Sequence, residues 1–298
     1  MIFEGSGVAL VTPFQECGIN VPVLDELIEF QIAGHTDAIL VNGTTGEPPT
    51  MRQREMEELV AEAAKKIAGR VPLIVGVGGN NTRAAVETAI FAKRAGAQAV
   101  LAVTPYYNRC TEDGLVLHFE AIADAAELPV IIYNIPSRTT VNIPPSVLAR
   151  LASHPNIQAV KEASGNIAQV TETVRLTGGN LDLYSGNDDQ VVPLLALGGI
   201  GVISVLANIM PRYVHDMVEA FRLGQTDTAL QMQLEVNGLV HALFSEVNPI
   251  PVKAALHRMG FNVGDVRLPL TPLRPENERK LYAEMELMGL FGTGGLQS

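Results

Sequence analysis

One lysine follows an apolar run whose pattern predicts a buried strand. Lys161 comes directly after residues 157–160 (Ile-Gln-Ala-Val), so we expect its amine to point into the mouth of a site. Burial disfavours the charged form of an amine and lowers its pKa, and a neutral lysine amine can attack a ketone to form a Schiff base. The competing interpretation is a strand-end lysine whose ammonium reaches solvent along its aliphatic stem.

Other polar groups follow further predicted strands. The turn Thr44-Thr45-Gly46 offers hydroxyls and backbone N–H groups that can bind a carboxylate, although helix capping alone would explain the two threonines equally well. Tyr133 has a phenol that can donate and accept a proton; the alternative is a buried aromatic with a satisfied hydroxyl. Arg138, in the next loop, can bind a second carboxylate through two hydrogen bonds, unless it is simply solvated.

The chain has no pattern of metal ligands. Asp188 and Asp189 lack companions at ligand spacing and stand where a helix begins, so we assign them to the helix start, where acids complement the macrodipole. The six histidines are scattered, and Cys17 and Cys110 are too few for a disulfide framework or a metal cluster. We therefore expect no metal.

Apolar runs alternate with amphipathic segments along the chain. Eight runs lack the apolar–polar alternation of a half-exposed strand, which indicates strands covered on both faces: 8–11, 38–41, 73–77, 99–103, 130–133, 157–160, 181–184 and 201–205. Helical patterns occupy 51–68, 82–95, 113–126, 145–152, 166–177 and 188–197. The first helical pattern begins with a capping-box spacing at 50–53. It keeps one apolar face, made of Met56, Leu59, Val60, Ala63 and Ile67.

This alternation of strands and helices predicts an α/β fold, a (β/α)8 TIM barrel. The alternative is a doubly wound open sheet, which normally carries Gly-x-Gly-x-x-Gly after a strand. The nearest candidate, Gly76-Val77-Gly78-Gly79, lacks the third glycine at the right offset. A barrel has its active site at the C-terminal ends of its strands, which is where the lysine, threonines, tyrosine and arginine stand.

Strand patterns stop at residue 211. Helices are predicted over 214–223, 226–244, 251–259 and 275–288. We therefore expect a catalytic (β/α)8 barrel over residues 1–224 and a C-terminal helical subdomain over residues 225–298. The last few residues, rich in Gly, Gln and Ser, are expected to fray.

Composition restricts the class of partner. The 298 residues carry 21 Lys and Arg against 32 Asp and Glu, a formal charge of −11, and 47% are hydrophobic. We expect no nucleic-acid partner, because the chain is acidic and binding to the phosphate backbone depends on clustered basic residues. No stretch approaches the ~18 apolar residues of a membrane span, and the first residues do not have the pattern of a secretion signal. We expect a soluble cytoplasmic protein with no membrane partner.

Several motifs, in the same order along nearly the whole chain, resemble the dihydrodipicolinate (4-hydroxy-tetrahydrodipicolinate) synthases, in the class I aldolase superfamily that includes N-acetylneuraminate lyase. They lie at 43–47 (Gly-Thr-Thr-Gly-Glu), 76–80, 104–108, 133–139 (Tyr-Asn-Ile-Pro-Ser-Arg-Thr), 160–164, 184–186, 201–205 and 248–253 (Asn-Pro-Ile-Pro-Val-Lys). The resemblance implies a lyase that condenses pyruvate with L-aspartate 4-semialdehyde, in lysine and diaminopimelate biosynthesis.

The resemblance also implies catalytic roles. Lys161 would form the Schiff base with pyruvate, and Thr44, Tyr107 and Tyr133 would form a proton relay. In this family the tyrosine that matches Tyr107 comes from a neighbouring subunit, which implies a homo-oligomer, a homotetramer built as a dimer of dimers. No cofactor is implied, because a protonated imine is itself the electron sink.

Substrate-binding roles are implied in the same way. Thr45, with the backbone around Thr44, would hold the pyruvate carboxylate, and Arg138 would bind the carboxylate of the semialdehyde. Gly186 and Ile203 would line the pyruvate pocket, mainly through main-chain groups. Sibling Schiff-base lyases for sugar acids, such as N-acetylneuraminate or 2-keto-3-deoxygluconate, generally lack this arginine, so Arg138 favours the synthase.

Two further alternatives are weaker. A catalytically inactive barrel that serves as a scaffold predicts the loss of the lysine or of a relay residue, and these are present. A phosphate-binding barrel enzyme predicts a glycine-rich turn after strand seven or eight, whereas residues 198–201 precede the eighth strand.

Feedback inhibition by lysine is not expected. Inhibited family members bind lysine at the dimer interface, through ionisable side chains that include a histidine and a glutamate. The corresponding neighbourhood here has Pro48, Pro49, Gln53, Met56 and Ala84. None of these residues carries a charge to receive an amine or a carboxylate.

Overall fold

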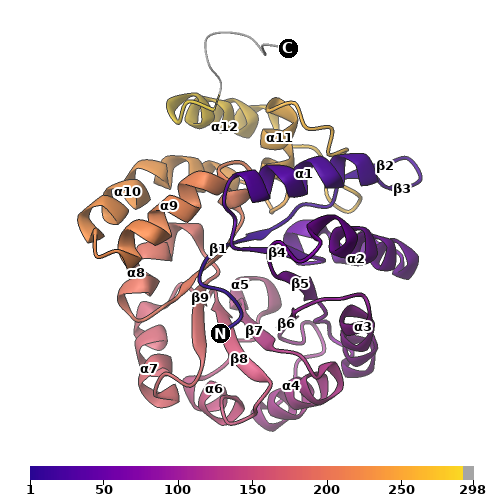
Figure 1. The fold of residues 1–298 in the computed structure, drawn as a ribbon, viewed down its shortest axis with the longest axis vertical. Helices are drawn as coiled ribbons and strands as arrows, with labels where there is room; N and C mark the ends of the chain where they lie inside the picture. Colours follow the sequence, from indigo (N-terminus) through magenta and orange to yellow (C-terminus); the bar gives the residue numbers. More distant parts are fainter. Residues whose placement is uncertain (291–298) are drawn as a thin grey trace.

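Eight parallel strands close into a barrel in the computed structural model, which describes residues 1–290 (Figure 1). In chain order they are β1 (Gly5–Ala9), β4 (Ala38–Val41), β5 (Leu73–Gly76), β6 (Ala99–Val103), β7 (Val130–Asn134), β8 (Ile157–Glu162), β9 (Asp182–Ser185) and β10 (Gly201–Ser204). β1 closes the barrel by pairing with both β10 and β4. The predicted TIM barrel is confirmed, and each predicted strand corresponds to one of its strands.

The strand register sets the polar groups of the barrel interior side by side. Tyr133 on β7 pairs with Lys161 on β8, which pairs in turn with Tyr184 on β9. Paired residues of neighbouring strands point to the same face of a sheet. Tyr133 and Tyr184 belong to an apolar cluster of strand residues and adjacent loops that fills the interior, together with Ile203. Lys161 therefore points into the barrel beside Tyr133.

Helices surround the strands as an outer ring (Figure 1). They are α1 (Val21–Ala33), α2 (Gln53–Ile67), α3 (Thr82–Arg94), α4 (Glu112–Ala126), α6 (Pro145–Leu151), α7 (Ile167–Thr177), α8 (Val191–Ala196) and α9 (Pro211–Arg222). The predicted apolar face of α2 is confirmed, since its buried residues are the five expected ones. Its predicted capping box is wrong by two residues: the Arg52 N–H donates to Glu55 Oε2 at 2.8 Å, and the Thr50 hydroxyl donates to the Glu47 carbonyl.

Two N-terminal elements differ from the sequence-based prediction. α1 is an additional helix, whose buried face carries the expected 3.6-residue period. Its amphipathic pattern is weak because Val21, Phe30 and Ile32 add apolar side chains elsewhere; the Phe30 ring contacts the Phe261 ring in a tilted arrangement, with centroids 5.2 Å apart. β1 ends at Ala9 rather than at residue 11, because the Val11 N–H donates to the Asn208 side chain at 3.0 Å instead of to a strand.

Three helices follow the ring: α10 (Thr226–Leu243), α11 (Ile250–Arg258) and α12 (Pro275–Leu287). α10 packs against α9, and α12 packs against both α10 and α11. In Figure 1, α11 and α12 lie outside the ring, next to α1. The helices predicted after residue 211 are confirmed, while the domain boundary at 224 stays a prediction and the tail expected to fray, 291–298, lies outside the described residues. Within residues 1–290, no helix has the length and apolar character needed to cross a bilayer.

Candidate active site

Lys161 is a buried amine that contacts no anionic partner among residues 1–290. Its side chain is 4% exposed, and its Nζ lies 4.4 Å from the centre of the Tyr133 ring. Burial lowers the pKa of Lys161 to about 8, an effect that the Asp188 carboxylate opposes and the Arg138 guanidinium reinforces. The amine is therefore neutral in a substantial fraction of molecules near neutral pH, as an imine-forming nucleophile requires.

Tyr133 lies directly beside that amine. Its side chain is 5% exposed, and burial raises the pKa of its phenol above the ordinary value, so the hydroxyl stays protonated. A neutral phenol can give a proton to one oxygen and accept another from a second group. The predicted proton-transfer group is thus adjacent to the predicted nucleophile.

The turn after β4 is a short 3-10 helix, Thr44–Gly46, held against the end of β1. The Thr12 hydroxyl donates to the Gly46 carbonyl at 2.7 Å. A Cβ on Gly46 would meet that hydroxyl oxygen at 2.9 Å, so a larger residue would displace the turn. The turn ends at Glu47, whose φ of 58° reverses the chain and buries its side chain. The fold therefore fixes the turn that the sequence predicts to hold a carboxylate.

A glycine gives the lysine room to reach the cavity. A Cβ on Gly186, at the end of β9, would lie 3.1 Å from Lys161 Cε and 2.8 Å from the Ala163 Cβ. Any larger side chain would push against the stem of the nucleophile. Glycine is therefore needed at position 186 because a side chain there would collide with Lys161. This agrees with the prediction that Gly186 contributes mainly main-chain groups to the pocket.

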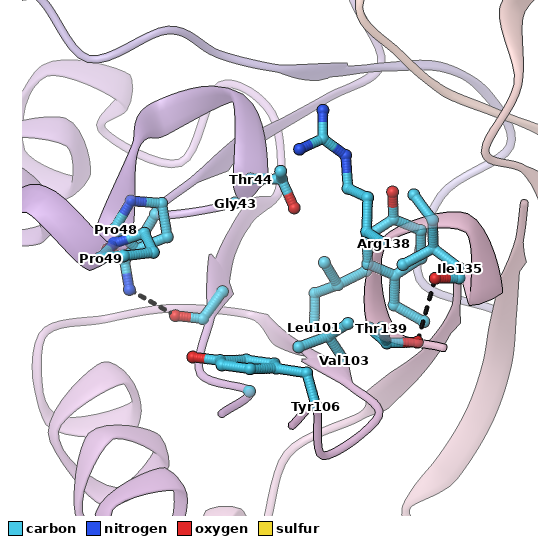
Figure 2. A pocket seen from close by; sticks show the side chains of 14 residues that line it. Gly43, Thr44, Pro48, Pro49, Leu101, Val103, Tyr106, Ile135, Arg138 and Thr139 are labelled. Atoms are coloured by element: carbon cyan, nitrogen blue, oxygen red, sulfur yellow. Dashed lines mark hydrogen bonds between the residues drawn. The ribbon is translucent and has the colours of Figure 1, made fainter. Parts of the chain in front are cut away.

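Six of the predicted residues line one cavity of about 150 Å³: Thr44, Thr45, Tyr133, Arg138, Lys161 and Gly186. A neighbouring cavity of about 320 Å³ shares Thr44, Tyr133 and Arg138 with it. Figure 2 shows this second cavity, with the Thr44 hydroxyl and the Arg138 guanidinium on one side and the Tyr106 ring on the other. Ile203 is fully buried in β10 and is absent from the lining of both cavities.

Comparisons with known proteins show the family of the chain. A model of the dihydrodipicolinate synthetase family matches residues 2–287. The chain belongs to this family. It is 51% identical over 291 residues to a 4-hydroxy-tetrahydrodipicolinate synthase of Thermoanaerobacter sp. (strain X514), an alignment that covers 97% of this chain and 98% of the relative.

Solved structures of the family have the same fold. Dihydrodipicolinate synthase from Aquifex aeolicus superposes with a TM-score of 0.94 at 44% identity, over 97% of this chain and 99% of that chain. The family member from Cyanidioschyzon merolae, crystallised with lysine bound, has a TM-score of 0.94 at 39% identity, over 97% of this chain and 99% of that chain.

Tyr107, like Ile203, lines neither cavity. It lies in the loop after β6, its side chain is 92% exposed, and its φ is 68°. A positive φ is unfavourable for a bulky residue and persists only where the surroundings impose it. The backbone thus holds an aromatic side chain out in solvent, away from the residues with which it is predicted to exchange protons.

Asp188 has a role in addition to the predicted one. The acidic pair does begin a short 3-10 turn, Asp188–Gln190, but the Asp188 carboxylate does not complement that turn. Its Oδ2 accepts the N–H groups of Val205 and Leu206, at 2.9 Å each, which fixes the chain after β10. Burial raises the pKa of Asp188, and these N–H groups oppose the rise. The pair thus stands at a helix start, as predicted, but the Asp188 carboxylate also holds the chain after β10, which the prediction did not include; Asp189 is exposed.

Sequence reasoning missed a second buried lysine and its partners. Lys253 Nζ lies 2.7 Å from Glu47 Oε1 and is 2% exposed. The Arg267 N–H donates to Glu47 Oε2 at 2.9 Å, so both carboxylate oxygens are held by the C-terminal helical region. Asn248, in the same motif as Lys253, lines the cavity of Lys161. A lysine among the apolar residues of the helix predicted over 251–259 was the available signal.

Proposed function

We propose that the chain is a lyase that condenses pyruvate with L-aspartate 4-semialdehyde to 4-hydroxy-tetrahydrodipicolinate, in lysine and diaminopimelate biosynthesis. Support comes from relatives that are named for this activity. They are about 50% identical to this chain over nearly its whole length. The observation that carries the proposal is a buried amine with lowered pKa, Lys161, in one cavity with a phenol, a threonine turn and an arginine.

The first stage is imine formation. The neutral Lys161 amine adds to the keto carbon of pyruvate, and the carbonyl oxygen takes up a proton. The resulting carbinolamine loses that oxygen as water and leaves a protonated imine. Tyr133 is suited to deliver and recover these protons, because its ring lies beside the amine and its hydroxyl stays protonated.

The second stage forms the carbon–carbon bond. The protonated imine withdraws electrons, so a methyl proton of the bound pyruvate leaves and an enamine forms. The enamine carbon attacks the aldehyde carbon of the semialdehyde, and the new alkoxide takes up a proton. The amine of that substrate then attacks the imine carbon, closes the ring and releases Lys161. One water is lost over the whole reaction, in the imine stage.

Two anion-binding groups select the substrates. The Thr45 hydroxyl and the backbone of the Thr44–Gly46 turn bind the pyruvate carboxylate near Lys161. Arg138 extends from a single helical turn, α5 (Pro136–Thr139), and binds the carboxylate of the semialdehyde. A sugar-acid substrate offers hydroxyls there instead of a second carboxylate, so Arg138 favours the synthase over the sibling lyases.

The exposed Tyr107 completes the relay of a neighbouring subunit. Thr44 and Tyr133 line the cavity within one chain, whereas Tyr107 points into solvent on a strained backbone. A neighbour that receives this side chain explains both features, so the active unit is a dimer, within a cytoplasmic homotetramer. Co-expression of Lys161→Ala and Tyr107→Phe chains should restore activity, because mixed dimers contain one intact site. Mixed dimers without restored activity would contradict the shared site.

The test of the overall proposal is product formation. Purified enzyme with pyruvate and L-aspartate 4-semialdehyde should yield 4-hydroxy-tetrahydrodipicolinate, detected by coupling to its reduction or by mass spectrometry. Cleavage of N-acetylneuraminate or 2-keto-3-deoxygluconate at comparable kcat/KM, with no turnover of the semialdehyde, would replace the synthase with a sugar-acid lyase.

A further inference from the structure

Asn248 connects the two groups that are proposed to bind the substrate carboxylates. It lies in the segment between α10 and α11 and is 6% exposed. Its Nδ2 donates to the Thr45 hydroxyl oxygen at 3.0 Å, across 203 residues of sequence. Its backbone carbonyl accepts a hydrogen bond from Arg138 Nη2 at 3.1 Å. One residue of the C-terminal helical region therefore touches both anion-binding side chains.

The hydrogen bond from Asn248 determines what the Thr45 hydroxyl can do. A hydroxyl has one proton to donate and can accept at its oxygen. Because the amide of Asn248 occupies the acceptor side, the hydroxyl proton of Thr45 points elsewhere, and within residues 1–290 it is donated to no protein group. Thr45 is 2% exposed and lines the cavity of Lys161, so the proton is directed into that cavity.

We propose that Asn248 is a positioning residue for pyruvate. Its side-chain amide holds the Thr45 hydroxyl as a donor to the pyruvate carboxylate, while its backbone carbonyl fixes the position of Arg138 relative to Thr45. The inference rests on the proposed function and adds a residue outside the barrel to it. The Oδ1 atom of Asn248 is buried without a hydrogen-bond partner, so the amide is retained at a cost in stability.

The surroundings of Asn248 keep it in place. Five residues further on, Lys253 forms its buried ion pair with Glu47, which ends the turn that carries Thr45. Two cations lie over the Phe14 ring, with Lys253 Nζ at 4.3 Å and the Arg267 guanidinium at 3.8 Å from its centre. The Lys253–Glu47 ion pair therefore attaches the Asn248 segment to the threonine turn through two side chains that line neither cavity.

The test compares pyruvate affinity in two variants of Asn248. Asn248→Asp exchanges the donor for an anion, which captures the Thr45 proton and repels the pyruvate carboxylate. Asn248→Ala only removes the donor. We expect the pyruvate KM to rise about 10- to 100-fold for Asn248→Asp and less for Asn248→Ala, with a much smaller change in kcat. Borohydride trapping at saturating pyruvate should still label Lys161. If Asn248→Asp does not fold, Asn248→Ala is measured in its place.

A second background separates positioning from general stability. In Thr45→Val protein the hydroxyl is gone, so Asn248→Ala should change pyruvate affinity less than twofold. An unchanged effect of Asn248→Ala in that background, or no effect of either variant in the wild-type background, would overturn the inference. The matched control is Asn156→Ala, which removes a similar amide bond, to the Ala123 carbonyl, before β8 and should leave pyruvate affinity unchanged. Wild-type protein that fails to trap pyruvate would instead contradict the proposed function.

Discussion

Two buried lysines in this protein are alike in burial and in their aromatic neighbour, but only one of them is paired with a carboxylate. Lys161 and Lys253 are 4% and 2% exposed, and each amine lies over an aromatic ring, at 4.4 and 4.3 Å. Burial lowers the pKa of both. Lys253, however, contacts the Glu47 carboxylate at 2.7 Å, whereas Lys161 Nζ has no hydrogen-bond or ion-pair partner within the described residues.

The comparison shows that burial alone does not make a nucleophile. An amine that is paired with a carboxylate keeps its proton and its lone pair is unavailable, while an unpaired amine in a cavity loses the proton more easily. The acid that raises the pKa of Lys161 is Asp188, and its Oδ2 is already engaged by two backbone N–H groups. In the proposed mechanism Lys161 of the barrel is the nucleophile, whereas Lys253 of α11 holds the turn that carries Thr45 through Glu47.

Breaking the pair of Lys253 should affect stability most. Lys253→Met leaves the Glu47 carboxylate buried without its cation, which costs about 3–5 kcal/mol of unfolding free energy. The measurement is the denaturant midpoint or the thermal midpoint of the variant. Lys253→Met combined with Glu47→Gln should recover part of the loss, because no isolated charge remains. A Lys253→Met protein as stable as the wild type would contradict the structural role of Lys253.

Arg138 distinguishes binding of the second substrate from imine formation. Arg138→Ala removes a charged hydrogen-bond donor, worth ~1.5–3 kcal/mol, so kcat/KM for the semialdehyde should fall by about one to two decades. Pyruvate trapping on Lys161 should change little. The check is steady-state kinetics with both substrates, alongside single-substrate trapping. Equal losses in trapping and turnover would mean that Arg138 serves the pyruvate site instead.

The pH dependence of imine formation should report the pKa of Lys161, about 8. Because only the neutral amine attacks, the initial rate of trapping should fall about tenfold for each pH unit below that value and level off above it. Cyanoborohydride reduction with pyruvate over pH 6 to 9.5 gives the profile. A rate that keeps rising tenfold per unit up to pH 9.5 would show an ordinary lysine and would contradict the effect of burial.

Of the changes considered, free L-lysine added to the assay should have the smallest effect on activity. Pro48, Pro49 and Tyr106 line the cavity of about 320 Å³, and the Gln53 amide is already bonded to Glu57 at 2.9 Å. Without a charged partner, a buried ammonium is costly to desolvate. Steady-state assays with added L-lysine should therefore show less than twofold inhibition at millimolar concentration. Sub-millimolar inhibition would contradict this expectation.

Short-range patterns in the sequence predicted most of the strands and helices, but not the contacts between residues that are distant in sequence. The positions of Thr44 after β4, of Tyr133 near the end of β7 and of Lys161 near the end of β8 follow from short apolar runs. The buried face of α2 follows from helical spacing. The contacts of Asp188 and Asn248 could not be predicted in this way. The partners of Asp188 lie 17 and 18 residues away, and Thr45 lies 203 residues from Asn248. Closure of the barrel and docking of α11 create these pairs, and neither leaves a periodic signal.

The most direct test of the account is to map the lysine that pyruvate labels. Purified enzyme is incubated with pyruvate, reduced with borohydride, digested and analysed by peptide mass spectrometry, with Lys161→Ala and Lys253→Met proteins in parallel. We predict an adduct on the peptide that contains Lys161, retained in the folded Lys253→Met protein and absent from folded Lys161→Ala protein. An adduct on Lys253, or labelling that survives in Lys161→Ala, would contradict the assignment of the unpaired lysine as the nucleophile.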